Sequence, residues 1–507
     1  MKRYITIDKR YLLIPICAQQ ELKTITLSFQ GERIYEFNVP VHEKEEGYYG
    51  FHYFAPIDVE KYIGKVLLIE GGISGSFLDA LSLSDTVPEN LQAHPLLHFT
   101  PRTGWMNDPN GLLYKDGVYH LYFQYNPFDT RWENMCWGHA VSKDLLHWEQ
   151  KETALYPDGD GVMYSGSGIV NEQGLLGLPR DAYIYFYTCA GNKSKWSLGK
   201  TFNQRIAYST DQGKTLTKME GSVVRHISEE NRDPKVYWHE ESRAYIMVLY
   251  LKDNEFMILR SRDLKNWKKS QVLTLKDAWE CPDLRRIPIE GGGEKWVFWC
   301  ADGYYFLGEF DGYEFKTDGV KHEAYRTKLP YAAQTIWGTE DVITIPWLRT
   351  KNKGKLYTGV MGLPRQLTLA RTPEGLQLRQ NPVKAFRKAR IGVSASQGEG
   401  KVFYMMQKAA VIELSIHMQE PCDFSANLYG TSISYIPSCG KINVGKDTVE
   451  MGKDLNDFSI IADGEIVEVS AENGLVFAVI ELDTDRKSGN VTVDVSGKAY
   501  VDIYRVE

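Results

Sequence analysis

The chain has 507 residues, about three times the commonest domain size, so we expect two or more domains rather than one small module. Its composition, 43% hydrophobic and 25% charged, is that of a folded globular protein and excludes a disordered, collagenous or coiled-coil chain. The formal net charge of -7 leaves no excess of cations for a phosphate backbone or an anionic membrane, so we expect neither a nucleic acid nor a membrane as a partner.

The first residues are basic, but polar and acidic positions interrupt them before any apolar stretch reaches the length of a signal peptide. We therefore expect a cytoplasmic protein, and no window approaches the apolar length of a membrane span. The seven cysteines form no CxxC pair and are odd in number, which argues against a disulfide framework and a cysteine zinc site. We expect them to be small buried apolar residues.

Residues 1–90 alternate apolar and polar positions and end in the polar stretch SLSDTVPEN at residues 82–90. Alternation with a period of two is typical of strands, so this part predicts a small N-terminal β domain followed by a linker. The 12 Trp, 31 Tyr and 20 Phe residues of the whole chain, together with 44 Gly, suit pleated sheets, tight turns and flat stacking surfaces for sugars or bases.

Residues 95–370 contain a weak internal repeat. The string SKDLLHW at residues 142–148 is echoed by SRDLKNW at 261–267, and more loosely by STDQGKT at 209–215 and GEFDGYEF at 308–315. A strand, an Asp turn and an aromatic residue that return about every 50 residues are typical of four-stranded propeller blades. We therefore predict a five-bladed β-propeller over residues 95–370.

Residues 375–507, after RTPEG at 371–375, again alternate strands and turns, as a β-sandwich does. The fold class predicted for the whole chain is all-β: a five-bladed β-propeller followed by a C-terminal β-sandwich, with an extra small N-terminal β domain.

Three carboxylates stand in rigid local sequences. Asp108 lies in GWMNDPNG at residues 104–111, Asp233 in NRDPK at 231–235 and Glu280 in WECPDL at 279–284. Asn, Pro and Gly fix tight turns, and the Trp, Cys and Pro around Glu280 predict an apolar setting that favours its protonated form. A lone carboxylate beside Pro is more often an Asx turn than a catalytic group.

A propeller can bring these distant residues together, because the first strand of each blade lines the central axis. Glycoside hydrolysis needs such a set: an ionised carboxylate that attacks or stabilises the anomeric carbon and a protonated one that donates to the leaving oxygen.

The strings around these residues resemble the retaining β-fructosidases of glycoside hydrolase family 32, the invertases, inulinases and levanases. Seven motifs occur in the family's order: WMNDPNG at 105–111, YFQYNP at 122–127, WENMCWGHA at 132–140, YSGS at 164–167, RDP at 232–234, ECPDL at 280–284 and YAAQT at 331–335.

The resemblance implies a role for each carboxylate. Asp108 would be the nucleophile that forms a covalent fructosyl-enzyme, and Glu280 the general acid that later activates water. Asp233 would hold the ring hydroxyls and stabilise the transition state, with Arg232 keeping Asp233 ionised. Retention implies that the carboxyl groups of Asp108 and Glu280 lie about 5 to 5.5 Å apart.

The resemblance also implies a set of supporting residues. The residues expected to bind the terminal fructose are Asn107, Gln124, Trp132, Tyr164, Ser165, Arg232 and Trp347. Trp105 is expected to wall the same funnel. Cys281 would lie buried beside the acid rather than act as a nucleophile, since nothing cationic adjoins it in the sequence. No metal and no cofactor is expected, because the chain carries neither a His-x-x-x-His pair nor a Rossmann or phosphate-binding loop.

The function predicted is hydrolysis of terminal β-D-fructofuranosyl residues from fructans, fructo-oligosaccharides or sucrose. Three alternatives stay open: a fructosyltransferase that uses the same site, an inverting enzyme like the five-bladed arabinan-cleaving enzymes, and a non-catalytic fructan-binding propeller. The N-terminal 90 residues resemble the extra β module of some bacterial fructan-degrading members, which favours fructans. The module could equally buttress the propeller or join copies in a homo-oligomer.

Overall fold

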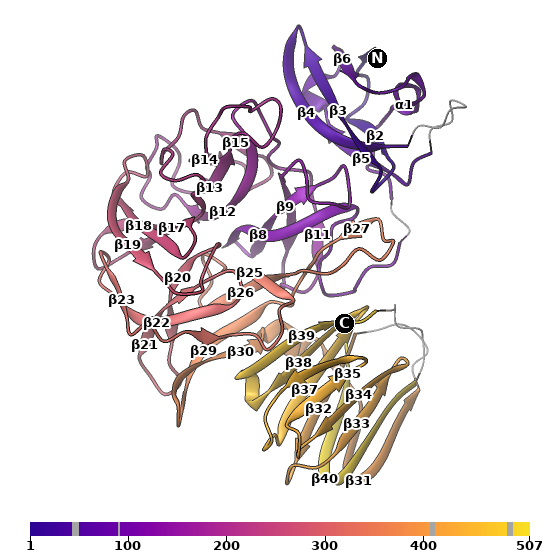
Figure 1. The fold of residues 1–507 in the computed structure, drawn as a ribbon, viewed down its shortest axis with the longest axis vertical. Helices are drawn as coiled ribbons and strands as arrows, with labels where there is room; N and C mark the ends of the chain where they lie inside the picture. Colours follow the sequence, from indigo (N-terminus) through magenta and orange to yellow (C-terminus); the bar gives the residue numbers. More distant parts are fainter. Residues whose placement is uncertain (43–49, 90–91, 406–410, 484–489) are drawn as a thin grey trace.

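The computed structural model describes residues 1–42, 50–89, 92–405, 411–483 and 490–507, without the side chains of residues 397–405 and 490. Strands make up most of this part of the chain (Figure 1). The α-helices in it are α1 (Gly75–Ala80) and α2 (Lys384–Lys388), and the 3-10 turns are η1 (Glu60–Tyr62) and η2 (Glu472–Gly474). No helix within the described residues has the length and apolar character that crossing a membrane requires.

The N-terminal residues form two small antiparallel sheets. One contains, in spatial order, β1 (Lys2–Thr6), β6 (Val66–Gly71), β3 (Glu21–Phe29) and β4 (Glu32–Val41). The other contains β5 (Tyr53–Asp58), β2 (Tyr11–Ile16) and β7 (Ser82–Ser84). Their shared apolar core includes Phe128, which follows the last residue of a propeller strand, and the Phe37 ring lies 4.2 Å from the Phe128 ring. The N-terminal sheets are therefore packed onto the propeller through buried aromatic contacts.

Residues 104–382 form a succession of largely antiparallel sheets of four or five strands, the arrangement of propeller blades (Figure 1). The first sheet contains β8 (Gly104–Lys115), β9 (Val118–Asn126), β10 (Cys136–Ser142), β11 (Trp148–Gln150) and the late strand β27 (Tyr357–Thr358). The second contains β12 (Val162–Val170), β13 (Tyr183–Ala190), β14 (Asn203–Ser209) and β15 (Thr217–Lys218). The third contains β16 (Arg232–His239), β17 (Ala244–Lys252), β18 (Glu255–Ser261) and β19 (Lys268–Thr274).

The fourth sheet contains β20 (Asp283–Pro288), β21 (Glu294–Trp299), β22 (Tyr304–Phe310), β23 (Phe315–Thr317) and β24 (His322–Glu323). The fifth contains β25 (Pro330–Thr335), β26 (Ile343–Leu348), β28 (Val360–Met361), β29 (Arg365–Thr372) and β30 (Gly375–Pro382). The first strands of neighbouring sheets contact one another, β8 with β12, β12 with β16, β20 with β25 and β25 with β8. The starts of these inner strands therefore converge on one end of the central axis.

The last propeller sheet ends later than the sequence predicted. The string RTPEG at residues 371–375, taken as the end of the propeller, is the hairpin turn between β29 and β30, with Thr372 opposite Gly375. Pro and Gly mark a tight turn inside a sheet as readily as a boundary between domains, so the propeller continues to Pro382.

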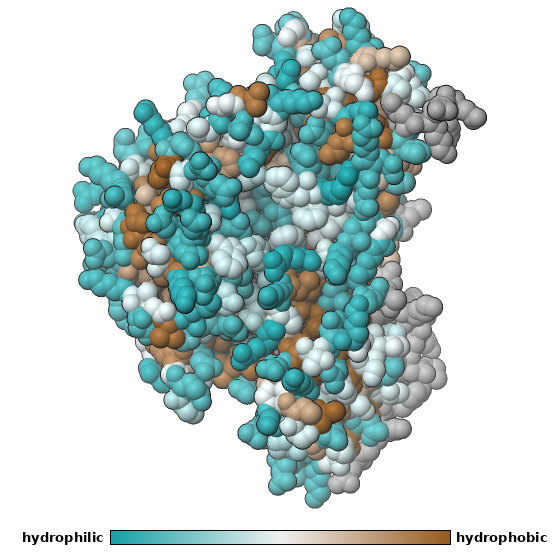
Figure 2. All heavy atoms as spheres, viewed as in Figure 1, coloured by the Kyte–Doolittle hydropathy of each residue, from teal (hydrophilic) through white to brown (hydrophobic). Residues whose placement is uncertain are grey.

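The C-terminal residues fold as the predicted β-sandwich around an apolar core of their own. Its strands are β31 (Arg390–Met405), β32 (Val411–Met418), β33 (Phe424–Leu428), β34 (Thr431–Ile436), β35 (Lys441–Val444), β36 (Asp447–Glu450), β37 (Asp457–Asp463), β38 (Ile466–Ala471), β39 (Val476–Glu481) and β40 (Asn490–Val506). The face of the molecule shown in Figure 2 is mostly hydrophilic, with apolar residues scattered over it, as on ordinary soluble surfaces.

A buried ionic cluster joins the propeller to the sandwich. His98, before the first sheet, lies 2.9 Å from Asp463 and 3.2 Å from Glu468, and Glu468 also pairs with Arg365 of β29. The two carboxylates raise the pKa of His98 to about 9 against the opposing effect of burial. His98 is therefore a cation at neutral pH, and the cluster holds together three stretches of chain that are far apart in sequence.

The cysteine prediction is confirmed for five of the seven residues. Cys17, Cys136, Cys189, Cys281 and Cys300 are buried. Cys422 is half-buried and Cys439 is exposed, so these two are not core residues.

Candidate active site

β-Bulges direct the site residues into the funnel at the starts of the inner strands. The pairing register shifts between Met106 and Pro109 around Asp108, and between Arg232 and Lys235 around Asp233. A bulge inserts an unpaired residue and turns its side chain away from the normal alternation of the strand. Asp233 accordingly has a φ of 63°, in the left-handed region that residues other than Gly seldom adopt.

A third bulge, between Tyr164 and Gly166, presents Ser165 to the same funnel. It depends on glycine, because a Cβ on Gly166 would lie 1.8 Å from the carbonyl oxygen of Phe186. The string YSGS therefore contains a serine that points at the site and a glycine that allows the two strands to approach closely enough.

The predicted site residues line one cavity of about 290 Å³. Those that line it are Asn107, Asp108, Gln124, Trp132, Tyr164, Ser165, Arg232, Asp233, Glu280 and Trp347. They come from four of the five propeller sheets and from the loops that follow β9 and precede β20. The structure thus brings together all ten residues that the sequence predicted to act on or bind the sugar.

Asp108 is held by two hydrogen-bond donors. The Ser165 hydroxyl donates to Asp108 Oδ2 at 2.6 Å, and the Asn107 side-chain amide donates to Oδ1 at 3.1 Å. Removal of water by the surrounding protein raises the pKa of Asp108, and the negative charge of Glu280 raises it further, while the two donors lower it. These donors fix the orientation of the carboxylate and favour its ionised form, as a nucleophile requires.

Asp233 has a pKa well above that of an ordinary carboxyl group. Burial raises the pKa of Asp233 to about 7, and although Arg232 opposes this, the charges of Asp108 and Glu280 add to it. Arg232 Nε lies 3.8 Å from Asp233 Oδ2, too far for a hydrogen bond. Arg232 therefore favours the ionised form of Asp233, as expected, but it only partly offsets the effect of burial and of the two neighbouring carboxylates.

Arg232 instead binds two other carboxylates. Its Nη2 donates to Glu280 Oε1 at 2.6 Å, and its Nη1 donates to Glu230 Oε2 at 3.1 Å. The guanidinium also lies 4.6 Å from the centre of the Tyr250 ring. Arg232 is therefore a cation whose guanidinium is held between Glu280 and Glu230.

Glu280 lies among polar groups rather than in the apolar setting that the sequence predicted. Besides Arg232, the Tyr331 hydroxyl donates to Glu280 Oε2 at 2.5 Å, and the Trp279 indole N–H donates to the Tyr331 oxygen at 3.1 Å. Trp279 is 38% exposed, so it does not enclose the carboxyl group. The sequence placed Trp279 beside Glu280 along the chain, but Glu280 itself, with φ 54°, turns its side chain toward the fifth sheet.

Cys281 lies between the two deeper carboxylates. Its Sγ is 3.5 Å from Asp108 Oδ2 and 3.6 Å from Asp233 Oδ2, and its backbone N–H donates to Asp233 at 3.1 Å. Burial raises the pKa of the Cys281 thiol, and the carboxylates raise it further. The group is thus a protonated thiol and a weak hydrogen-bond donor, not a nucleophile. The Asp108, Asp233 and Cys281 atoms lie within 4.8 Å of one another, but a protonated thiol is a poor metal ligand.

Two unpaired donors face the cavity. Gln124 Nε2 and Trp347 Nε1 are buried and have no hydrogen-bond partner within the described residues, although both side chains line the pocket. Buried donors are almost always paired in a native protein, so these two are available to the hydroxyl groups of a ligand. Trp105, which was expected in the wall, is not among the residues that line the cavity, and its indole N–H donates to Asn107 Oδ1 at 2.8 Å.

Four further lining residues were not among the predicted ones. They are Lys193, Phe202, Glu230 and Tyr331. Tyr331 begins the YAAQT string, and Glu230 precedes the RDP string by two residues, so both stood next to recognised motifs. Lys193 and Phe202 lie in the segment between β13 and β14, Lys193 near its start and Phe202 at its end. No local pattern in the sequence distinguished these two residues.

Comparison with known proteins relates this site to one family. The family model described as the glycosyl hydrolases family 32 N-terminal domain matches residues 98–382. The chain is 34% identical to a levanase of Bacillus subtilis over 336 residues, which cover 57% of this chain and 47% of the levanase. It is 40% identical to an invertase of Debaryomyces hansenii over 304 residues, which cover 54% of each chain. The matched part is thus about half the length of these relatives.

Solved structures show the same fold over a larger share of the chain. An exo-inulinase from Aspergillus awamori superposes with a TM-score of 0.73 at 24% identity, covering 82% of this chain and 98% of that chain. A fructofuranosidase from Schwanniomyces occidentalis in complex with fructose superposes with a TM-score of 0.71 at 25% identity, covering 81% and 97%. Because the family model covers more than half of its residues, the chain belongs to the glycosyl hydrolases of family 32.

Proposed function

We propose that the protein is a retaining β-fructosidase that releases terminal β-D-fructofuranosyl residues from fructans, fructo-oligosaccharides or sucrose. The observation that carries this proposal is the placement of three carboxylates in one cavity with a different set of donors on each. Its levanase and invertase relatives are named for this chemistry.

In the first step, Asp108 attacks C2 of the fructosyl unit, and the bond from C2 to the leaving oxygen breaks. Glu280 gives a proton to that oxygen, so the leaving sugar departs as a neutral alcohol. Glu280 suits this role because its side chain is 30% exposed, whereas that of Asp233 is only 4% exposed. The leaving group therefore meets Glu280 on the open side of the cavity.

In the second step, Glu280 takes a proton from water, and the resulting hydroxide displaces Asp108 from C2. Two inversions at C2 give overall retention. Asp233, held by the Cys281 N–H, binds ring hydroxyls and stabilises the positive charge that develops in both transition states. Its pKa of about 7 means that the carboxylate cluster retains a proton up to neutral pH, so the chemistry begins from a partly protonated site.

The unpaired donors of two residues that line the cavity favour a terminal sugar over an internal one. A cavity of about 290 Å³ with Gln124 and Trp347 donors in its wall suits one fructosyl ring, which supports action at the non-reducing end. Short imported fructosides suit the cytoplasmic location proposed from the sequence.

The experiment is a fructose-release assay on sucrose, kestose, inulin oligomers and levan oligomers. We expect release from at least one, and Asp108→Asn and Glu280→Gln should each reduce turnover by orders of magnitude with the fold intact. Asp263→Asn is the matched control, because this carboxylate caps a turn between β18 and β19 and does not line the cavity. Near-normal activity in either site variant would refute the assignment.

The same assay separates the alternatives. Longer fructosyl chains at high sucrose concentration would indicate a transferase, and an inverted first product in NMR would indicate the inverting mechanism. Binding of fructan without any release of fructose would indicate a non-catalytic propeller.

A further inference from the structure

A second, larger cavity lies at the other end of the first propeller sheet. Its volume is about 650 Å³, and its walls come from the β8–β9 hairpin, strands β10 and β11, the start of β13, the loop at residues 212–215 and the N-terminal domain. Lys115 of this cavity ends the strand that carries Asp108 near its start. Six residues of strand lie between the two, so Lys115 is about 20 Å from the nucleophile.

The charge of this cavity is opposite to that of the chain. Its lining contains the cations Arg10, Arg102, Lys115, Lys151 and Lys214 and the carboxylates Asp116, Glu149 and Glu152, an excess of two cations in a chain of net charge -7. Arg10 is paired with Asp58 and Glu152, and Lys151 is paired with Glu149. Lys214 forms no ion pair with any residue that the structure describes, and Lys115 Nζ lies 3.6 Å from the nearest oxygen of Asp116. An anion entering the cavity would therefore find ammonium groups that are only partly neutralised.

Two neutral imidazoles form part of the lining. His120 Nδ1 and His139 Nε2 are 3.1 Å apart, and neither ring makes another hydrogen bond within the described residues. Burial lowers the pKa of His120 to about 4, and burial also lowers the pKa of His139 well below its ordinary value. Since each neutral ring uses one nitrogen in this pair, each has a second nitrogen left for a partner, one as donor and one as acceptor.

The rest of the lining suits a molecule with both hydroxyl groups and an apolar face. Val87, Val118 and Val141 line the cavity together with Tyr183. Carboxylates accept hydrogen bonds from sugar hydroxyls, and valine side chains pack against the C–H face of a sugar ring.

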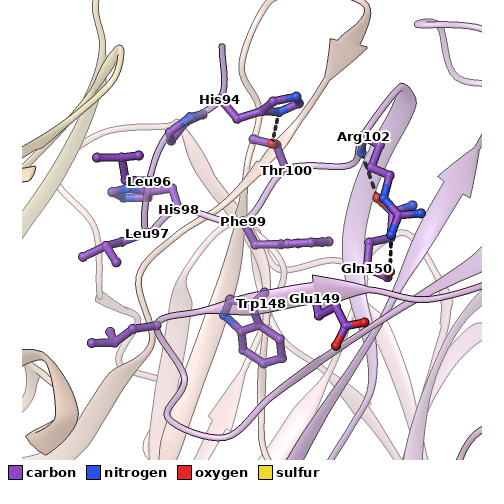
Figure 3. A pocket seen from close by; sticks show the side chains of 12 residues that line it. His94, Leu96, Leu97, His98, Phe99, Thr100, Arg102, Trp148, Glu149 and Gln150 are labelled. Atoms are coloured by element: carbon purple, nitrogen blue, oxygen red, sulfur yellow. Dashed lines mark hydrogen bonds between the residues drawn. The ribbon is translucent and has the colours of Figure 1, made fainter. Parts of the chain in front are cut away.

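The Arg102–Gln150 pair forms a rigid part of the wall. The Arg102 backbone N–H donates to Gln150 Oε1 at 2.8 Å, and its guanidinium donates to the Gln150 carbonyl at 2.7 Å (Figure 3). Figure 3 shows a smaller cavity, of about 320 Å³, which also borders this pair. That cavity contains Arg102 but no lysine, so the concentration of positive charge belongs to the larger one.

We propose that the larger cavity is a second ligand site, separate from the catalytic carboxylates, and that it binds a phosphorylated sugar. Lys115, Lys151 and Lys214 hold the phosphate, the imidazoles and carboxylates bind the hydroxyl groups, and the valines contact the ring. A cavity of this size falls in the range of small-molecule sites and is larger than the fructosyl pocket.

The test is calorimetric titration of the full chain with glucose 6-phosphate, with glucose and inorganic phosphate as separate probes. We expect one site for glucose 6-phosphate, weaker binding of phosphate and no binding of glucose. The variant K151Q/K214Q should weaken binding of glucose 6-phosphate at least tenfold, because it removes two charge-assisted contacts. The charge reversal K214E should weaken it further.

The matched control is K268Q/K269Q, which removes two exposed cations from β19 in another sheet. It should bind glucose 6-phosphate like the unchanged protein, and both double variants should release fructose at the unchanged rate. Absence of binding, or equal binding to K151Q/K214Q and to the unchanged protein, would overturn the proposal. Equal affinity for phosphate and glucose 6-phosphate would show an adventitious anion only and overturn the sugar assignment. Because binding is measured apart from fructose release, a failure of the proposed function leaves this result independent.

Discussion

The hydrogen bonds that lead from Trp279 through Tyr331 to Glu280 give the sharpest quantitative prediction. Tyr331→Phe removes the phenol that donates to the Glu280 carboxylate at 2.5 Å and leaves the ring in place. A hydrogen bond to a charged group is worth about 1.5 to 3 kcal/mol. At about 1.4 kcal/mol per factor of ten, the variant should lose about 10- to 150-fold in kcat/KM on sucrose.

Trp279→Phe tests the same chain one step further from Glu280. The indole N–H donates to the neutral Tyr331 oxygen at 3.1 Å, and such a bond is worth about 0.5 to 1.5 kcal/mol. The loss should be about 2- to 13-fold in kcat/KM. Since Trp279 acts on Glu280 only through Tyr331, the Trp279→Phe change should cost almost nothing once Tyr331→Phe is present.

The assay is steady-state fructose release by the two single variants and the double variant. Sucrose is compared with β-fructosyl fluoride, whose leaving group needs no proton. If the chain positions the acid, the losses should be large on sucrose and small on the fluoride. Trp148→Phe is the control, because it deletes an indole hydrogen bond in β11 outside the site. Additive losses in the double variant, or equal losses on both substrates, would refute the reasoning.

Three further predictions concern stability and the shape of the site. Gly166→Ala should destabilise the protein and abolish activity, because the new Cβ meets the Phe186 carbonyl; normal fructose release would contradict this. Asp233→Asn should raise the free energy of unfolding by up to about 4 kcal/mol at pH 8 and leave it unchanged at pH 4. The reason is that the raised pKa of about 7 in the folded protein makes the stability of the unchanged protein fall as pH rises from about 4 to about 7. Denaturant titrations at both pH values measure the difference. His98→Gln should lower the free energy of unfolding most below pH 6.5, by about 3 kcal/mol, and least above pH 9. The reason is that the raised pKa of His98 supplies stability that is lost as pH rises through about 9. A loss of stability that does not depend on pH would contradict the ionic cluster.

Much of the site followed from the sequence because its residues lie in short contiguous strings. Asp108 and Ser165 each occur in the sequence beside the residues that form their β-bulges. Each short string therefore specifies both the functional side chain and the backbone conformation that positions it. Tyr331 was missed as a partner of Glu280 because the two meet across different sheets, 51 positions apart in the chain. Lys193 was missed for the same reason, since only the folded propeller brings it to the cavity.

The electrostatics of the site could not be predicted from neighbours in sequence. Arg232 adjoins Asp233 along the chain, yet its guanidinium donates hydrogen bonds to Glu280 and Glu230, while its Nε lies 3.8 Å from Asp233 Oδ2. The state of each carboxylate depends on burial and on charges from other strands, which only the tertiary structure supplies.

The overall fold was predictable from alternation and the repeat, whereas its boundaries were not. The hairpin at residues 371–375 has the composition of a linker, and only the pairing of β29 with β30 shows that it lies inside a sheet. The contact of Phe128 with the N-terminal core likewise joins parts of the chain that no local pattern connects.

The most direct test of the central claim is mass spectrometry of Glu280→Gln after brief reaction with β-fructosyl fluoride. This variant can still form the fructosyl-enzyme, because fluoride leaves without a proton, but it lacks the base that activates water for the second step. The proposed mechanism predicts that the protein gains the mass of one anhydrofructose unit and that digestion places it on the peptide containing Asp108. An unmodified protein that still turns over the fluoride, or a label on any other residue, would contradict the mechanism.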